Sequence, residues 1–138
     1  MKKIISLLLV GFLLVNCSDN DEDSNRVVTP VEGTWQLMEA RFYGLEGGSS
    51  SEDSIDYSDQ NIVYTFNSDG TLEVSGGDNA GYTNGIYTYE YEANAMGVVY
   101  TQVVYIDESM WYFYNYEEGE IRLSKLHVDG PELVFVEL

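Results

Sequence analysis

The stretch of sequence that decides the fold is Ile62-Val63-Tyr64-Thr65-Phe66-Asn67-Ser68-Asp69-Gly70-Thr71-Leu72-Glu73-Val74. Two runs rich in apolar and β-branched residues flank a four-residue loop, in which Asn and Asp can bond their own backbone and Gly supplies a positive φ. This pattern predicts a β-hairpin. Side chains alternate between the two faces of a strand, so one face is expected to point into the core. Its members are Ile62, Tyr64, Phe66, Leu72 and Val74.

The rest of the chain repeats this style of sequence. No stretch after residue 30 keeps a 3.6-residue apolar period, and short runs of Val, Ile, Tyr, Phe and Thr alternate with turn-forming clusters. Uniformly short connections favour pairing in sequence order, so we expect an all-β, eight-stranded antiparallel up-and-down barrel. A β-sandwich of the same strands remains open, and pairing of the first strand with the last would decide for the barrel. The predicted strands are 33–42, 61–66, 71–75, 86–91, 98–106, 111–116, 121–126 and 133–138.

Two of these segments resemble a known group of proteins. The first strand opens Gly33-Thr34-Trp35-Gln36-Leu37, and the hairpin reads Tyr64-Thr65-Phe66-Asn67-Ser68-Asp69-Gly70-Thr71-Leu72. Together they resemble the lipocalin-like domains of many Bacteroidota lipoproteins, which share the Gly-x-Trp with true lipocalins. The resemblance covers residues 33–72 and extends to the remainder only by strand count. It implies that Trp35 packs across the closed end of the barrel as a structural plug.

The amino-terminal segment predicts export and lipid anchoring. Lys2 and Lys3 precede an apolar run, residues 4–15, that is shorter than the roughly 20 residues of a membrane span. Leu14-Val15-Asn16-Cys17 resembles the lipobox of bacterial lipoproteins, which implies acylation of Cys17 and cleavage before it. The acidic residues 18–22 resemble the surface-export signal of Bacteroidota lipoproteins.

These features divide the chain into a lipoprotein signal peptide (1–16), an acidic tether (17–30) and a lipocalin-like barrel domain (31–138). The implied location is the outer membrane, lipid-anchored and facing the cell exterior. An ordinary signal peptide without a lipid remains an alternative.

The charge of the chain limits its partners. Twenty-four acidic residues face six basic ones, for a formal net charge of −18. Such a surface repels phosphates, so we expect no nucleic-acid binding and membrane attachment only through acyl chains on Cys17. The acidic, Gly- and Ser-rich stretch 44–60 is interpreted as a mobile loop over an opening or a disordered insertion. Calcium bound in that loop is an alternative, with Glu46, Glu52, Asp53, Asp56 and Asp59 as its oxygen donors.

Aromatic residues are the best candidates for contact with a ligand or partner. Tyr87, Tyr89 and Tyr91 share one strand face, which points either into the barrel or outward. Strands 98–106 and 111–116 are apolar on both faces, so their outer face is either covered by the long loop or exposed. For each tyrosine, packing against neighbouring strands is an alternative to stacking on a ligand ring. The contact cluster that we predict here is Tyr100, Trp111, Tyr112, Tyr114 and Tyr116.

Catalytic chemistry is not expected. The chain has one histidine, and its one cysteine is assigned to the anchor, so neither a nucleophile–base pair nor a zinc site can be assembled. His127 lies in a predicted turn, and so do the paired carboxylates, where solvation keeps them from acting as raised-pKa acids. We therefore expect no enzyme, metal or cofactor. The predicted function is binding of a small apolar, aromatic or carbohydrate ligand; the alternative is a protein-interaction module of the outer-membrane envelope that uses an exposed aromatic face.

Overall fold

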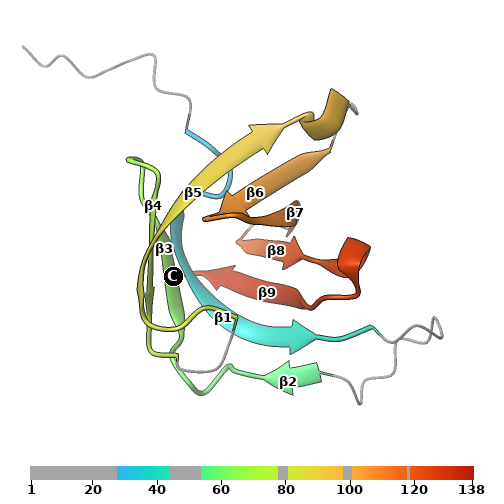
Figure 1. Cartoon of the computed structure of the whole chain (residues 1–138). Helices are drawn as coiled ribbons and strands as arrows, with labels where there is room; N and C mark the ends of the chain where they lie inside the picture. Colours follow the sequence, from blue (N-terminus) through green and yellow to red (C-terminus); the bar gives the residue numbers. More distant parts are fainter. Residues whose placement is uncertain (1–27, 44–53, 78–80, 98–100, 118) are drawn as a thin grey trace, which may run out of the picture.

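The computed structural model describes residues 28–43, 54–77, 81–97, 101–117 and 119–138. The proposed export signal, Cys17 and Tyr100 lie outside these ranges, as does the side chain of Tyr116. The described residues form one antiparallel sheet whose strands follow one another in the order β2-β1-β3-β4-β5-β6-β7-β8-β9 (Figure 1). The strands are β1 (Gly33–Arg41), β2 (Ser54–Asp56), β3 (Val63–Phe66), β4 (Thr71–Ser75), β5 (Gly85–Ala93), β6 (Gln102–Ile106), β7 (Ser109–Glu117), β8 (Glu120–Ser124) and β9 (Glu132–Glu137).

The sheet closes on itself. β1 pairs with β9 from Trp35 opposite Glu137 to Arg41 opposite Glu132, which joins the first and last barrel strands. The fold is therefore a closed eight-stranded antiparallel up-and-down barrel with one additional strand, β2. This confirms the predicted barrel and excludes the sandwich. Closure leaves no long unpaired edge between β1 and β9.

The additional strand was not predicted. β2 pairs with the second half of β1, whereas β3 pairs with the first half of β1 along the same edge. A register shift between Leu37 and Glu39 marks a bulge where the two partners change over, and Tyr57 N donates to Met38 O there (2.8 Å). All three residues of β2 are exposed, so no apolar alternation reveals the strand in the sequence.

The barrel is filled by the side chains of its inner face. In the β3–β4 hairpin the predicted core face is buried as expected, and Glu73 and Ser75 on the other face are exposed. Trp35 is buried near the end of the barrel where β1 begins, and its Nε1 donates to Val31 O (2.9 Å).

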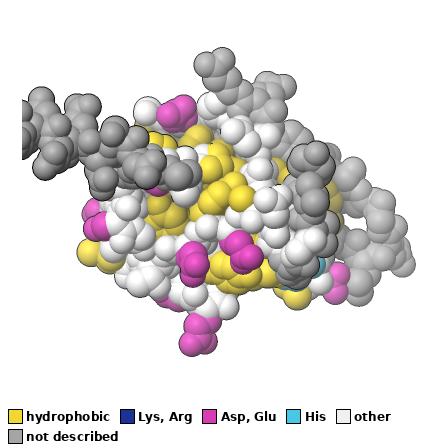
Figure 2. All heavy atoms as spheres, turned by 90° about the horizontal axis from the view of Figure 1, so that it is seen from above, with side chains coloured by type: hydrophobic (Ala, Val, Ile, Leu, Met, Phe, Trp, Pro, Cys, Tyr) yellow, Lys and Arg dark blue, Asp and Glu magenta, His cyan; other side chains and the backbone are white. Residues whose placement is uncertain are grey.

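On the outer surface, seen from above on the side where β5 and β6 lie, hydrophobic side chains gather between acidic ones (Figure 2).

Some strand ends differ from the prediction. The strand predicted at 98–106 begins at Gln102, after a short 3-10 helix, η1 (Ala95–Gly97), and residues 98–100 are outside the described part. β8 ends at Ser124 because a second 3-10 helix, η2 (Leu126–Val128), turns the chain toward β9. No helix in the described ranges is long and apolar enough to cross a membrane.

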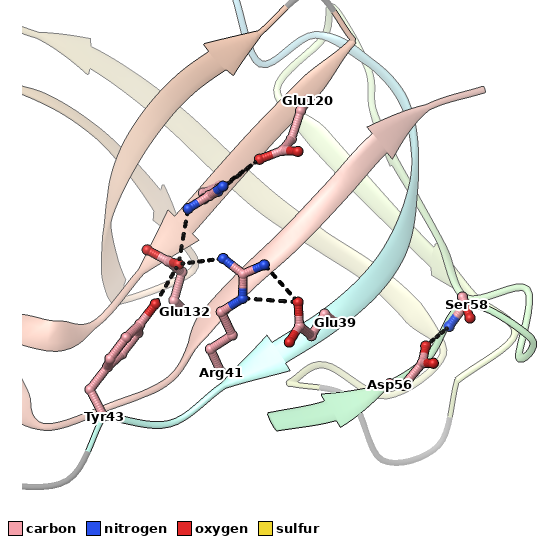
Figure 3. A network of polar contacts seen from close by, with 8 residues as sticks. Glu39, Arg41, Tyr43, Asp56, Ser58, Glu120 and Glu132 are labelled. Carbon is pink, nitrogen blue, oxygen red and sulfur yellow. Dashed lines mark hydrogen bonds and ion pairs between the residues drawn. The ribbon is translucent and has the colours of Figure 1, made fainter. Parts of the chain in front are cut away.

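A polar network crosses the outer wall at β8, β9 and β1 (Figure 3). The nearly buried carboxylate of Glu132 accepts a hydrogen bond from Tyr43 Oη (3.1 Å) and lies 3.7 Å from Arg41 and 3.6 Å from Arg122. Each arginine also pairs with a glutamate two residues earlier on its strand. In β1 the hydrogen bond from Arg41 lowers the pKa of Glu39. These arginines are thus occupied within the wall. The two pairs are Arg41–Glu39 at 2.7 Å and Arg122–Glu120 at 2.8 Å.

Candidate ligand-binding site

The tyrosines of β5 point into the barrel. Tyr87, Tyr89 and Tyr91 are partly buried and pack against the core, whereas Thr88 and Glu90 between them are exposed. This settles the question that the sequence left open. Two of the three have structural partners within the barrel. Tyr89 Oη donates to Asn67 O (2.8 Å), and the Tyr91 ring stands edge-on to Phe113 with centroids 5.8 Å apart.

The middle of the barrel is solidly packed. Tyr64, Phe66 and Phe135 are at most 2% exposed. The Tyr64 and Phe135 rings meet edge-on at 4.9 Å, a favourable arrangement for aromatic pairs. Side chains of this size occupy the space that a deep ligand would need. A ligand site inside the barrel is therefore confined to one of its ends.

Four side chains gather at the end opposite Trp35, and we call them the mouth cluster: Tyr82, Tyr87, Trp111 and Lys125. Tyr82 comes from the β4–β5 connection. Lys125 directly follows Ser124, the last residue of β8, which pairs with Glu132 at the start of β9. The Tyr82 ring lies 5.0 Å from Tyr87 and 6.1 Å from Trp111, and Trp111 Nε1 donates to Tyr82 Oη (3.0 Å). The ammonium group of Lys125 sits 4.4 Å from the Trp111 ring centroid, which is cation–π distance.

Tyr82 is held in place by its backbone as well as its ring. Its backbone N donates to Tyr64 Oη (3.2 Å), and at Gly81 (φ +81°) an added Cβ would approach Leu133 Cδ1 to 3.3 Å. The chain therefore crosses close to the core at this point. Burial raises the pKa of Tyr82 and of Tyr64. Both phenols stay protonated at neutral pH and can donate as well as accept a hydrogen bond.

Lys125 is positioned by a tight turn. Its backbone N donates to Pro131 O (2.9 Å), and its carbonyl accepts from Val128 N (2.9 Å) and Gly130 N (3.0 Å). A Cβ on Gly130 would stand 2.6 Å from the Lys125 Cβ, so only glycine lets the turn close this tightly. Lys125 has no carboxylate partner within the described part of the chain, unlike the two arginines of the outer wall.

The structure divides the predicted contact cluster between the two faces of β7. Trp111 points inward to the mouth cluster, whereas Tyr112 and Tyr114 lie on the outer face. Tyr114 is 44% exposed, and Tyr112 stands edge-on to the exposed His127 with ring centroids 5.0 Å apart. A surface hollow of about 150 Å³ lies beside them, lined by Thr101, Gln102, Tyr112, Phe113 and Tyr114. Its two tyrosines belong to the outer face of β7, whereas Trp111 belongs to the inner face.

Two residues of the mouth cluster, Tyr82 and Lys125, were missed by the sequence reasoning. Both lie at or beyond strand ends, where a two-residue alternation gives no information. A signal was nevertheless present. Tyr82 is a bulky aromatic within a Gly- and Asn-rich connection, and Lys125 is one of only six basic residues in the chain.

Acidic side chains in the described ranges do not form a metal centre. No group of three or more His, Cys, Asp or Glu side chains is placed there to hold an ion. Asp56 Oδ1 accepts from Ser58 N (2.9 Å), and Asp59 is exposed. The other three residues of the calcium hypothesis, Glu46, Glu52 and Asp53, lie outside the described part. The turn residue Asp107 accepts from Thr88 N and Oγ1 (3.0 Å each), which is a structural role.

No protein-family model, curated protein or solved structure matches this chain. The fold and the geometry of the mouth cluster therefore carry the functional interpretation.

Proposed function

We propose that this protein is a surface-anchored lipoprotein whose lipocalin-like barrel binds a small ligand with an aromatic or sugar ring at the mouth cluster. The observation that carries the proposal is the gathering of three aromatic rings with three polar groups at one end of the barrel: Trp111 Nε1, Tyr82 Oη and Lys125 Nζ. Apolar walls with a few well-placed polar groups are typical of small-molecule sites. The rings supply stacking area, and the polar groups fix orientation.

A ligand that stacks on Trp111 has to move the Tyr82 ring aside. The Trp111 ring is only 3% exposed, because Tyr82 and Lys125 cover it. A hydrogen bond from Trp111 Nε1, worth about 1 kcal/mol, and an edge-on contact with the Tyr87 ring hold the Tyr82 side chain over Trp111. A ring that stacks on Trp111 replaces contacts of the same kind. The binding energy of such a ligand therefore offsets the rearrangement.

The end of the barrel at which the described chain begins is opposite the mouth cluster. Residues 28–32 lead into the start of β1, where Trp35 Nε1 donates to Val31 O (Figure 1). An anchor at Cys17 would join the domain at this end and leave the mouth cluster open to the medium. This arrangement suits capture of a ligand from the medium outside the cell.

Replacing Cys17 tests the anchor. We expect Cys17→Ser to abolish incorporation of labelled fatty acid and to move the protein from the membrane fraction to the soluble fraction, because the serine hydroxyl cannot form the thioether that carries the lipid. Cys17 lies before the barrel, so the barrel of the variant should keep its thermal stability. Unchanged membrane retention with no label would show that the protein is held by something other than acyl chains.

The mouth is tested with ring-bearing probes. We expect a panel of aromatic acids, aromatic alcohols and monosaccharides to include compounds that raise the Tm of the protein, and Tyr82→Ala to weaken their binding at least tenfold by calorimetry. Tyr114→Ala is the matched control, since it removes an exposed tyrosine from the outer face of β7. Binding that survives Tyr82→Ala but is lost in Tyr114→Ala would contradict the mouth as the site.

One observation favours a second candidate, a protein-interaction module. Tyr112 and Tyr114 border a surface hollow on the outer wall, and hydrophobic side chains form a band on the side of the barrel seen in Figure 2. Exposed apolar surface of this kind marks protein contacts when it is extensive. The partner would be another envelope protein. Its capture from intact cells by cross-linking should then depend on Tyr114 and not on Tyr82.

A further inference from the structure

We infer that the mouth cluster selects ligands in which the ring carries a carboxylate, and that Lys125 is the residue that binds this group. The inference rests on the proposed ligand-binding function of the mouth and specifies its substrate class as ring-bearing carboxylic acids. It starts from a contrast between Lys125 and the other cations of the described chain.

The cations differ in whether a carboxylate neutralises their charge. In a chain of net charge −18, a basic side chain is surrounded by carboxylates that can pair with it. Arg41 and Arg122 follow this expectation, each with its own glutamate and with Glu132 between them. Lys125 departs from it, since within the described ranges its ammonium contacts an aromatic face. An ammonium on a ring face keeps N–H donors available for an anion.

The position of Lys125 is set before any ligand arrives. Three backbone hydrogen bonds close the turn from Lys125 to Pro131, and Gly130 packs directly against the Lys125 Cβ. The root of the side chain is therefore fixed at the mouth, and its tip rests on Trp111. A group that is already placed loses less conformational entropy on binding than one that must be ordered by the ligand.

The neighbours of Lys125 fit a ring next to the carboxylate. Trp111 lies beneath the ammonium. The Tyr82 ring lies 6.1 Å from the Trp111 ring, and the Tyr87 ring lies 5.0 Å from the Tyr82 ring, so the aromatic surface continues through both tyrosines. A ring acid can place its ring against these side chains and its carboxylate on the ammonium. Lys125 also supplies local attraction in a protein whose overall field repels anions. A neutral ring can use only the aromatic part of this site.

Matched acid and amide probes test the inference. Calorimetry at low ionic strength on the chain from residue 17 onward should show benzoate binding about tenfold tighter than benzamide, and glucuronate about tenfold tighter than glucose. Lys125→Met keeps the apolar stem and removes the charge, so it should reduce the preference for the acids to less than twofold with neutral probes little affected. Lys125→Arg keeps the charge and should retain the preference. Circular dichroism confirms that each variant is folded.

The outcomes distinguish the role of Lys125 from the proposed ring binding at the mouth cluster. Equal binding of acid and neutral probes would overturn the role of Lys125 and leave the mouth as a ring site. A preference for acids that persists in Lys125→Met would assign the anion to another group, which also overturns the inference. If no probe of either kind binds the wild-type chain, the proposed function fails together with the inference.

Discussion

Trp35→Ala is expected to lower the free energy of unfolding by about 3 to 5 kcal/mol, the usual cost of removing a large buried aromatic ring. The ring is 5% exposed and belongs to the core cluster at the end of the barrel where β1 begins. Its loss opens a cavity there and also leaves Val31 O without the hydrogen bond from Nε1. Urea denaturation followed by circular dichroism measures the change, with an unchanged m value if only stability is affected.

Two further variants identify the source of this loss. Trp35→Phe keeps an aromatic ring but removes Nε1, so it should cost less than Trp35→Ala and more than a surface substitution. Ile86→Ala is the matched control, because Ile86 is 75% exposed on β5 and should shift stability by no more than about 0.5 kcal/mol. A loss below about 1 kcal/mol in Trp35→Ala would show that the ring is not a structural plug.

Gly76→Ala is the second large effect, and we expect it to cost more than about 3 kcal/mol or to prevent folding. Gly76 has φ +81°, a conformation that L-residues avoid at a cost of about 1 to 2 kcal/mol. The added Cβ would also stand 2.1 Å from Asn61 O, a backbone atom that cannot move aside by rotation. Asn61 itself has a positive φ, so both segments would have to shift. Thermal and urea denaturation provide the measurement.

Gly119→Ala separates the two contributions. Gly119 has nearly the same φ, +85°, but apart from its chain neighbours no atom of the described residues lies within 4 Å of an added Cβ. Its substitution should therefore cost only the conformational part, about 1 kcal/mol. If the two variants lose equal stability, the close approach of Asn61 to Gly76 has no energetic weight.

The barrel was predictable because its signals are local. The β3–β4 hairpin shows a strict two-residue alternation around a loop with the right turn chemistry, and short connections then leave few topologies. β2 was not predictable in this way. Its three exposed residues form a strand only because β1 continues past the end of β3, and that length is a property of the assembled sheet.

The mouth cluster was predictable only in part. Trp111 and Tyr87 stood among the predicted contact residues, and alternation alone places Trp111 on the opposite face from Tyr112 and Tyr114. Tyr82 and Lys125 reach the site from connections, and they meet Trp111 only after the barrel closes. Contacts between residues 82, 111 and 125 depend on tertiary structure, which no local pattern reports.

The pairing of β1 with β9 has a consequence for how the protein reaches its folded state. The two strands are separated by some ninety residues, so the seam that they form is a contact of very high sequence separation. Folding rates fall as such contacts come to dominate, because the loop entropy is lost before the contact is gained. A chain that lacks β9 keeps two open sheet edges and cannot close. If the chain is exported as we propose, slow closure of this kind helps it to remain unfolded while it crosses the membrane.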